Sequence, residues 1–443
     1  KNWKFTREDN NEFIKPAFDD SKWQSVTVPH DWAIYGPFSS LNDKQEVAIS
    51  QDGQKEAMEH AGRTGGLPFV GVGWYRTEFD VPQFQAGKRA TILFDGAMSH
   101  ANVYINGQKV GYWPYGYNSF YFDITKYLKP GEKNTLAVRL ENLPESSRWY
   151  PGAGLYRNVH LIITEDAYIP VWGTYITTPS VNEKFAKVNV RTKVVLPEGA
   201  DPAKYSVETS VWNPNKQKLT AVRTSLAQMK YNNNQAEQEF VIQTPSLWSP
   251  EMPALYSAET RLYEGDKLKD IYTTPFGIRS IEIIPDKGFF LNGKRTVFKG
   301  VCNHHDLGPL GAAVNDAAIR RQIRILKDMG CNAIRTSHNM PAPELIRACD
   351  EMGMMIMAES FDEWNVAKCK NGYNLLFDEW AEKDLVNLLH NFRNNPSVVM
   401  WCIGNEVPNQ WNEGDCKIAK WLQDICHRED PTRPVTQGMD APD

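Results

Sequence analysis

The pattern of apolar and polar positions changes character near residue 290. Before that point, short segments that alternate apolar and polar residues, such as 101–105, are separated by turn residues. This period-two alternation is typical of antiparallel strands, and Asn106-Gly107 between two such segments is a strong hairpin signal. We therefore predict two β-rich domains: a jelly roll over residues 1–166, followed by an immunoglobulin-like β-sandwich over residues 167–282.

Two segments stand apart from this alternation. Residues 39–65 contain few apolar positions and are predicted to form a loop insertion. Asn292-Gly293 predicts a second hairpin, which leads into a strand expected at residues 295–301.

From residue 283 onward, apolar strands alternate with segments of helical periodicity. Strands are expected at 295–301, 332–336, 354–358, 398–405 and 434–437, with helices after Asn315, at 343–351, around Leu385 and around Trp421. Strict alternation predicts a parallel sheet, and the absence of a glycine-rich phosphate loop favours a barrel over a doubly wound sheet. A complete barrel needs roughly 250 residues in eight units. Residues 283–443 are therefore predicted to be the N-terminal half of a TIM barrel, with the chain ending inside it.

The fourth of these strands carries the most informative residue. Residues 398–403 are apolar without alternation, which is typical of a strand buried on both faces. Gly404 ends the apolar run, and Asn405 and Glu406 then stand at the carboxyl end of the strand. In β/α barrels that end of the sheet carries the chemistry.

Composition excludes several classes of partner. The chain of 443 residues has a net charge of −5, no basic block and no apolar stretch of 18 residues, so we expect neither a nucleic-acid partner nor a membrane span. Its seven cysteines, all from Cys302 onward, lack C-x-x-C spacing and indicate neither a disulfide framework nor a zinc site. The aromatic content of 12% fits sugar binding and large β-rich cores equally. Because the chain opens on Lys1, we expect a processed chain whose export signal would not be visible.

Polar residues follow each predicted barrel strand: Asn303, His304, His305 and Asp306, then Arg335, Ser337, His338 and Asn339, then Glu359, Asp362, Glu363 and Trp364, and finally Asn405 and Glu406. Such a set suits sugar chemistry, because a glycoside hydrolase needs two carboxylates beside the scissile bond, about 5–5.5 Å apart in the retaining geometry. Glu406 is the first candidate acid/base, and its partner would come from Glu359, Asp362 or Glu363.

Two alternatives stay open for these residues. The three carboxylates of the third strand end could instead order the rim of the barrel. His304 and His305 could ligate a metal, but adjacent side chains point apart on an extended strand, which favours substrate contact or packing at the rim.

Six segments of the chain form longer motifs: Pro29–Trp32, Gly73–Arg76, Arg148–Arg157, Gly300–His305, Asn332–Pro341 and Arg393–Glu406. Together they resemble the signatures of glycoside hydrolase family 2, and the resemblance spans the whole chain. That family comprises retaining exo-β-glycosidases, namely β-galactosidases, β-glucuronidases and β-mannosidases. Residues 361–365 and 371–380 are most similar to the β-galactosidases of Bacteroides-type gut bacteria.

The resemblance implies a role for each candidate residue. It implies that Glu406 is the acid/base and that Arg335 orients the nucleophile. It also implies that five residues bind the substrate: Asn405, His304, His338, Asp362 and Trp364. Among these, Asn405 would form a hydrogen bond with the sugar 2-hydroxyl.

The sequence departs from the family in two ways. The nucleophile of the family is a Glu on the seventh barrel strand, so by resemblance this chain contains no nucleophile, Glu359 is set aside, and the fragment alone is expected to be inactive. Magnesium-dependent relatives carry a Glu-x-His after the third strand, whereas Glu363 is followed here by Trp364 and Asn365. We therefore expect no cofactor and no metal site, magnesium included.

The resemblance thus predicts a retaining exo-β-glycosidase that cleaves terminal β-galactosides by double displacement, with an oligosaccharide or glycoside as its substrate. The alternatives are a β-glucuronidase or β-mannosidase of the same family, or an inactive carbohydrate-binding fragment. The sequence allows a homo-oligomer. The gut-bacterial resemblance favours a periplasmic location, and the free cysteines leave the cytoplasm as the alternative.

Overall fold

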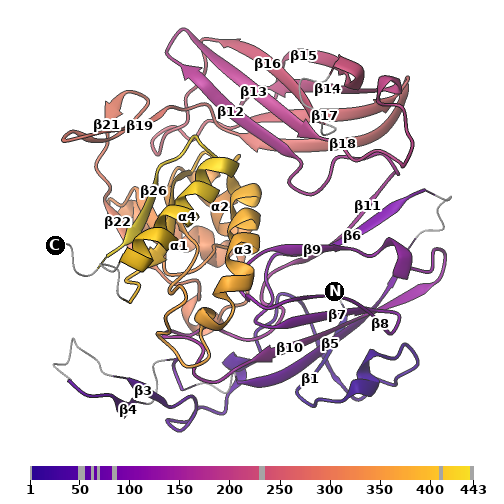
Figure 1. Cartoon of the computed structure of the whole chain (residues 1–443), viewed down its shortest axis with the longest axis vertical. Coiled ribbons are helices and arrows are strands. Elements are labelled where there is room, and N and C mark those ends of the chain that lie inside the picture. The colour runs from indigo at the N-terminus through magenta and orange to yellow at the C-terminus, as the bar shows by residue number, and fades with distance from the viewer. Residues whose placement is uncertain are drawn as a thin grey trace.

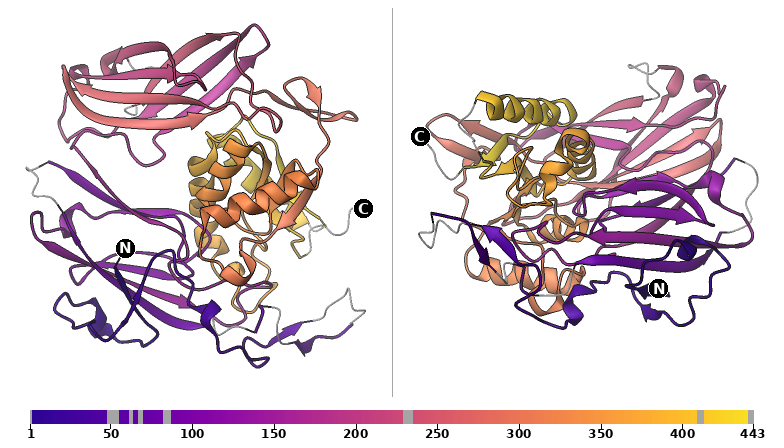
Figure 2. Two further views of the ribbon diagram at one scale, coloured as in Figure 1. Left: turned by 180° about the vertical axis from the view of Figure 1, so that it is seen from behind. Right: turned by 60° about the horizontal axis from the view of Figure 1, so that its bottom comes forward.

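The computed structural model describes residues 2–47, 55–60, 64–66, 70–81, 87–228, 235–408 and 413–439. These residues form two antiparallel β-domains and a C-terminal domain in which parallel strands alternate with helices (Figure 1). The C-terminal domain, coloured orange to yellow, lies against both β-domains in Figure 1 and in both views of Figure 2. The three-part fold class predicted from the sequence is confirmed.

The N-terminal domain packs two antiparallel sheets around one apolar core. Its strands are β1 (Trp3–Thr6), β2 (Gln24–Val26), β5 (Gly71–Asp80), β6 (Arg89–Phe94), β7 (Ala101–Ile105), β8 (Gln108–Trp113), β9 (Phe120–Asp123), β10 (Lys133–Asn142) and β11 (Val159–Thr164). The strand orders are β2-β1-β5-β10-β7-β8 and β11-β6-β9. Period-two alternation directs Ala101, Val103 and Ile105 of β7 into this core.

The first predicted hairpin is confirmed, whereas the predicted loop insertion is wrong in part. Asn106 and Gly107 join β7 to β8 with φ angles of 51° and 83°, as a tight hairpin turn requires. Within 39–65, β3 (Gln45–Val47) pairs with β4 (Met58–His60) as a two-stranded ribbon. Polar contacts anchor this ribbon, since the buried Gln45 side chain donates to the Ser147 carbonyl at 2.8 Å. The pattern of apolar residues in the sequence does not reveal such contacts. Residues 48–54 and 61–63 lie outside the described residues.

The middle domain is the predicted β-sandwich. Its strands are β12 (Thr174–Val181), β13 (Phe185–Lys193), β14 (Tyr205–Trp212), β15 (Lys218–Ser225), β16 (Gln235–Gln243), β17 (Tyr256–Glu264) and β18 (Lys267–Phe276). They form the sheets β12-β13-β16 and β15-β14-β17-β18. Val190 and Phe240 from one sheet meet Val211 and Ala258 from the other, so aliphatic and aromatic packing closes the sandwich.

A small ribbon of β19 (Ile281–Ile284), β20 (Gly288–Leu291) and β21 (Lys294–Arg295) leads into the C-terminal domain. Asn292 and Gly293, with φ angles of 53° and 73°, confirm the second hairpin. The strand expected at 295–301 is wrong in its extent, because Arg295 pairs with Phe290 in the ribbon. The parallel strand is β22 (Gly300–Asn303), only four residues long.

The C-terminal domain is built as the wall of a β/α barrel. Its parallel strands, which follow chain order in the sheet, are β22, β23 (Ala333–Thr336), β24 (Met355–Glu359), β25 (Val398–Asn405) and β26 (Val435–Gly438). The helices are α1 (Asp316–Asp328), α2 (Pro343–Met352), α3 (Phe377–Phe392) and α4 (Glu413–Glu429). Asn315 caps α1 by accepting from the Ala318 amide. Because all the strands are parallel, their carboxyl ends share one edge of the sheet.

The N-terminal domain and the barrel wall share one core. Met98, Tyr115 and Tyr156 of the N-terminal domain belong to the apolar cluster that α1–α4 form with the parallel sheet. Arg157 is fully buried between the domains, where it donates to the Met340 carbonyl at 2.8 Å. The N-terminal domain is thereby fixed against the loop that follows β23.

Candidate active site

Three neighbouring parallel strands end in one ion-paired cluster. Arg335 of β23 donates from Nη2 to Glu359 Oε1 at 3.0 Å and to Asn405 Oδ1 at 2.9 Å. Glu359 at the end of β24 is fully buried, which raises its pKa, while the charge of Arg335 opposes this rise. Gly438 on β26 leaves the space that the guanidinium occupies, since a Cβ there would lie 2.4 Å from Arg335 Nη2.

Two histidines and a tryptophan cover this cluster. Nδ1 of His338 lies 3.0 Å from Glu359 Oε1, and Trp149 of the N-terminal domain stacks on His304 with ring centroids 4.8 Å apart. Burial lowers the pKa of His338 to about 3, so the ring is neutral near pH 7. A neutral ring that donates from Nδ1 to Glu359 keeps Nε2 as an acceptor.

Asp362 is the most highly connected carboxylate at this edge. Arg148 donates to Asp362 from Nε at 2.9 Å and from Nη2 at 2.6 Å, and Lys368 Nζ lies 3.2 Å from Oδ1. Asn405 Nδ2 also donates to Oδ1 at 3.0 Å. Burial opposes ionisation, but the hydrogen bonds and charge of Arg148 and the charge of Lys368 outweigh it and lower the pKa of Asp362 to about 2. Asp362 is thus an anion with two cations beside it.

Glu406 differs from these carboxylates because it is exposed. Asn405 is completely buried, and the chain then turns at Glu406 with a φ of 42°, while the Glu406 amide donates to the Gly438 carbonyl at 2.9 Å. A positive φ is uncommon for a residue with a side chain and is frequent at functional turns. The electrostatic influence of Glu406 reaches both Arg148 and Lys368, so its carboxylate belongs to the same edge.

Three other candidate residues from the sequence analysis contact the protein itself at this edge. His304 and His305 lie just beyond β22, so the expectation that they belong to a strand is wrong, and His305 shares a 2.9 Å contact between Nε2 and the Pro151 carbonyl. Glu363 accepts from the backbone amides of Lys368 and Asn374 and holds the loop after β24. Trp364 is 2% exposed and donates from Nε1 to the Ile403 carbonyl at 2.8 Å, so its substrate contact stays a prediction.

Sequence reasoning did not single out Arg148, Trp149 or Lys368 as site residues. Arg148 and Trp149 lie within a recognised motif, but nothing in their spacing connects them to residues of the barrel wall more than 150 positions away. Lys368 lies on a loop without periodicity, and its Nζ bonds both Asp362 and the Asn405 carbonyl. Tertiary packing alone brings these three residues together.

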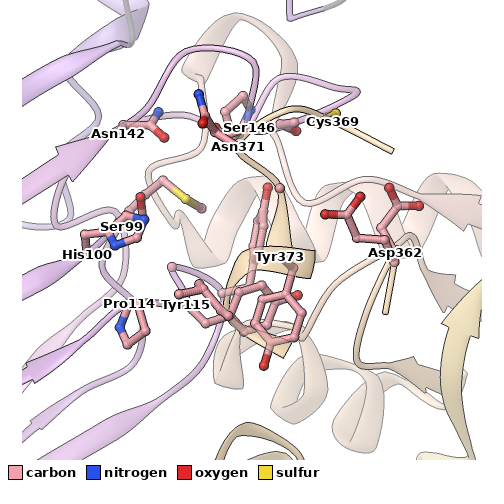
Figure 3. A pocket seen from close by; sticks show the side chains of 18 of the residues that line it. Ser99, His100, Pro114, Tyr115, Asn142, Ser146, Asp362, Cys369, Asn371 and Tyr373 are labelled. Atoms are coloured by element: carbon pink, nitrogen blue, oxygen red, sulfur yellow. The ribbon is translucent and has the colours of Figure 1, made fainter. Parts of the chain in front are cut away.

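A cavity of about 670 Å³ opens beside the cluster, between the N-terminal domain and the barrel wall (Figure 3). Ser99, His100 and Asn142 line it on one side, and Asp362 and Tyr373 on the other. His338 also borders this cavity, so a molecule bound there would reach the ion-paired edge.

The donor set at this edge does not suit a resident metal. Both oxygens of Glu363 accept backbone amides, and Asn365 stands where a His would be needed. Across the described ranges, no group of three or more His, Cys, Asp or Glu side chains is arranged to hold an ion. In the same residues, no helix is long and apolar enough to cross a membrane.

Comparison with known protein families identifies the family to which the chain belongs. The model of the sugar binding domain of glycosyl hydrolases family 2 matches residues 1–165, and that of its TIM barrel domain matches 282–442. A third model, described as glycosyl hydrolases family 2, matches residues 168–279. The chain belongs to glycosyl hydrolase family 2. The relatives of this family 2 chain include a β-galactosidase of Bacteroides ovatus, 40% identical over 99% of the chain, and a putative β-glucuronidase of Formosa agariphila, 36% identical over the whole chain.

Solved structures agree with this assignment. A family 2 member from Bacteroides cellulosilyticus superposes with a TM-score of 0.91 at 35% identity, over 100% of this chain and 56% of its own. The chain covers 53% of the Bacteroides ovatus relative and 40% of the Formosa agariphila relative. It therefore spans about half the length of the relatives that it matches.

Proposed function

We propose that this family 2 chain is part of a retaining exo-β-glycosidase that hydrolyses terminal β-galactosides by double displacement, with Glu406 as the acid/base. The observation that carries the proposal is the pair at the end of β25. Asn405 is buried and fixed between Arg335 and Asp362, while the next residue, Glu406, presents an exposed carboxylate at the same edge. A fixed amide beside an accessible carboxylate is what a sugar 2-hydroxyl and a departing oxygen require.

In this proposal Glu406 first gives its proton to the glycosidic oxygen as the aglycone leaves. A nucleophilic carboxylate attacks the anomeric carbon from the opposite face, and a covalent glycosyl-enzyme forms. Glu406, now ionised, accepts a proton from the water that attacks this intermediate, so configuration is retained and Glu406 recovers its proton.

We propose that the nucleophile is a Glu on a later barrel strand, beyond residue 443. The contacts of Glu359 support this choice, because Oε1 already faces Arg335 and His338, and Oε2 forms an ion pair with Arg335 Nε. Glu359 is also completely buried, whereas a nucleophile must reach the substrate. We assign Glu359 to holding Arg335 and His338 in place, and Arg335 to orienting the nucleophile.

Substrate hydroxyls would meet a set of fixed polar groups. The neutral His338 offers an acceptor at Nε2, and the ionised Asp362 offers a second acceptor at the same edge. His304 is held by the ring of Trp149 next to His338. Such groups reject analogues that lack the matching hydroxyl, because the buried partner would lose its hydrogen bond.

The charges of the site favour a neutral sugar over a uronic acid. Arg335 is paired with Glu359, while Arg148 and Lys368 are both paired with Asp362. In the part of the edge that the structure describes, each of these three cations already contacts a carboxylate, and Arg148 and Lys368 share the one of Asp362. This supports a β-galactoside over a β-glucuronide, although both activities occur among the names of the relatives.

Steady-state kinetics of the full-length protein on p-nitrophenyl β-galactoside, β-glucuronide and β-mannoside test the substrate. We expect kcat/KM for the galactoside to exceed the other two by roughly 100-fold or more, as expected when fixed hydrogen-bonding groups discriminate between sugars. A higher value for the glucuronide would overturn the galactosidase assignment and leave family membership unaffected.

A further inference from the structure

A second polar cavity lies where the three domains meet. It has an empty volume of about 1090 Å³, and we call it the junction pocket; its walls include Tyr121, Trp172, Arg191, Lys193, Arg393 and Arg428. Arg393 precedes β25, whereas Asn405 and Glu406 stand at the carboxyl end of that eight-residue strand. At about 3.3 Å per residue, the two ends of β25 are roughly 25 Å apart, so the junction pocket is separate from the catalytic edge.

The junction pocket has an excess of positive charge. Arg428 is neutralised by Glu382 and Glu429, and Glu429 also binds His390. By contrast, Arg191, Lys193 and Arg393 make no ion pair with any carboxylate among the residues that the structure describes. The walls of the junction pocket therefore carry more cations than carboxylates, because Glu429 is shared between Arg428 and His390. This excess of positive charge attracts an anion, and the surrounding protein strengthens the attraction by excluding water.

Two of these cations are held in place but remain unsatisfied. The guanidinium groups of Arg191 and Arg393 both lie over the ring of Tyr175, 5.6 Å and 4.4 Å from its centroid. Burial lowers the pKa of Arg393; Tyr175, Glu429 and Asp430 oppose this shift, and the nearby charge of Arg191 adds to it. The buried Nε of each has no hydrogen-bond partner. A bound anion would relieve both the missing hydrogen bonds and the repulsion.

The junction pocket is also lined by aromatic side chains. Tyr121, 39% exposed, meets Trp172 edge to face with ring centroids 5.4 Å apart. Trp172 has a φ of 55°, a conformation that is rare and costly for a bulky side chain and that is typical of functional sites when the surrounding structure imposes it. The hydroxyl of Tyr272 fixes this turn by accepting from the Trp172 amide at 3.1 Å. The rings offer flat apolar area to the C–H face of a pyranose.

We propose that the junction pocket is a non-catalytic binding site for an acidic oligosaccharide. Arg191, Lys193 and Arg393 would bind a sulfate or carboxylate group carried by the sugar, and Tyr121 and Trp172 would contact its ring. The site would hold an acidic stretch of glycan against the protein while the catalytic edge works elsewhere, so it is independent of which terminal sugar the enzyme cleaves.

Isothermal titration with a chondroitin 4-sulfate tetrasaccharide tests this assignment. The test variant combines Arg191→Gln with Lys193→Gln at the pocket end of β13. The control variant combines Lys184→Gln with Lys187→Gln, at or next to the other end of that strand. Both remove two positive charges from the region of strand β13, but only the first pair lines the junction pocket. We expect the first to weaken binding by about tenfold or more, as loss of charge-assisted hydrogen bonds predicts, and the second to leave it unchanged.

Two further measurements separate the glycan from a bare anion and from misfolding. Lys193→Gln alone, at an exposed position, should weaken binding without lowering Tm. Inorganic sulfate at matched ionic strength should bind far more weakly than the tetrasaccharide, and Trp172→Leu should weaken only the tetrasaccharide. Any of three results would overturn the proposal. They are equal affinity of the two double variants for the tetrasaccharide, no binding of the tetrasaccharide to the unmodified protein, and binding of sulfate as tight as that of the tetrasaccharide.

Discussion

Arg148 and Asp362 form a bidentate ion pair across the boundary between the N-terminal domain and the barrel wall. Nε and Nη2 of Arg148 donate to the two carboxylate oxygens at 2.9 Å and 2.6 Å, although 214 residues separate the partners in sequence. Asp362 in turn accepts from Asn405, the residue before Glu406. The N-terminal domain therefore helps to build the catalytic edge as well as to flank it.

Arg148→Met should destabilise the chain by about 3 kcal/mol, because it leaves the partly buried carboxylate of Asp362 with Lys368 as its remaining cation and Asn405 as a neutral donor. Urea denaturation measures the change. In the background of Asp362→Asn the same substitution should cost much less, which a double-mutant cycle detects. Lys420→Met, which removes an exposed ion pair with Asp424, is the control and should change stability by less than about 0.5 kcal/mol. A loss no greater than that of the control would contradict the interdomain role of Arg148.

Acid should destabilise the chain through its buried histidines. Burial lowers the pKa of His305 to about 3, below the value of about 6.5 expected when unfolded. The folded state therefore binds fewer protons, so this contribution to stability is complete above pH 6.5 and is lost as the pH falls from 6.5 towards 3. Between pH 7 and pH 5 the loss from His305 is about 2 kcal/mol.

Urea titrations of His305→Gln at these two pH values test this expectation. The variant should lose about 2 kcal/mol less stability than the unmodified protein between pH 7 and pH 5. His427→Gln, which changes an exposed histidine of α4, should follow the unmodified protein. The same pH dependence in all three proteins would show that His305 does not carry the effect.

Gly404→Ala should disturb the site through Trp364. A Cβ at this position would lie 2.9 Å from Trp364 Nε1, so the indole must move and its hydrogen bond to the Ile403 carbonyl is lost. The expected cost is about 1–3 kcal/mol in the free energy of unfolding. In a Trp364→Phe background, which removes the clashing nitrogen, the alanine should cost less. Equal costs in the two backgrounds would mean that Trp364 does not set the requirement for glycine.

Much of this fold follows from local patterns in the sequence. The unbroken apolar run of β25 predicts a strand with every residue buried, and Asn106-Gly107 predicts a hairpin, as observed. The first parallel strand is misplaced because β22 has only four residues and the apolar Val297 and Phe298 before it lie outside any strand. The ribbon of β3 and β4 has no apolar face towards a core, so a hydrophobic pattern cannot reveal it.

Of the site, only the residues at the ends of the parallel strands could be predicted from the sequence. Parallel strands bring their carboxyl ends together, and this places Arg335, Glu359 and Asn405 side by side. The partners of Asp362 could not be predicted, because Arg148 comes from another domain and Lys368 from a loop without periodicity. Which carboxylates are buried and paired, and which one stays exposed, depends on this packing.

The role of Glu406 can be tested most directly by azide rescue of Glu406→Ala in the full-length protein. With 2,4-dinitrophenyl β-galactoside, whose leaving group needs no proton, the glycosyl-enzyme should form and then accumulate because no base activates water. Azide enters the space left by the missing carboxylate, so we predict a large rate increase and β-galactosyl azide as the product, identified by NMR. Formation of α-galactosyl azide would make Glu406 the nucleophile, and no response to azide would contradict its assignment as the acid/base.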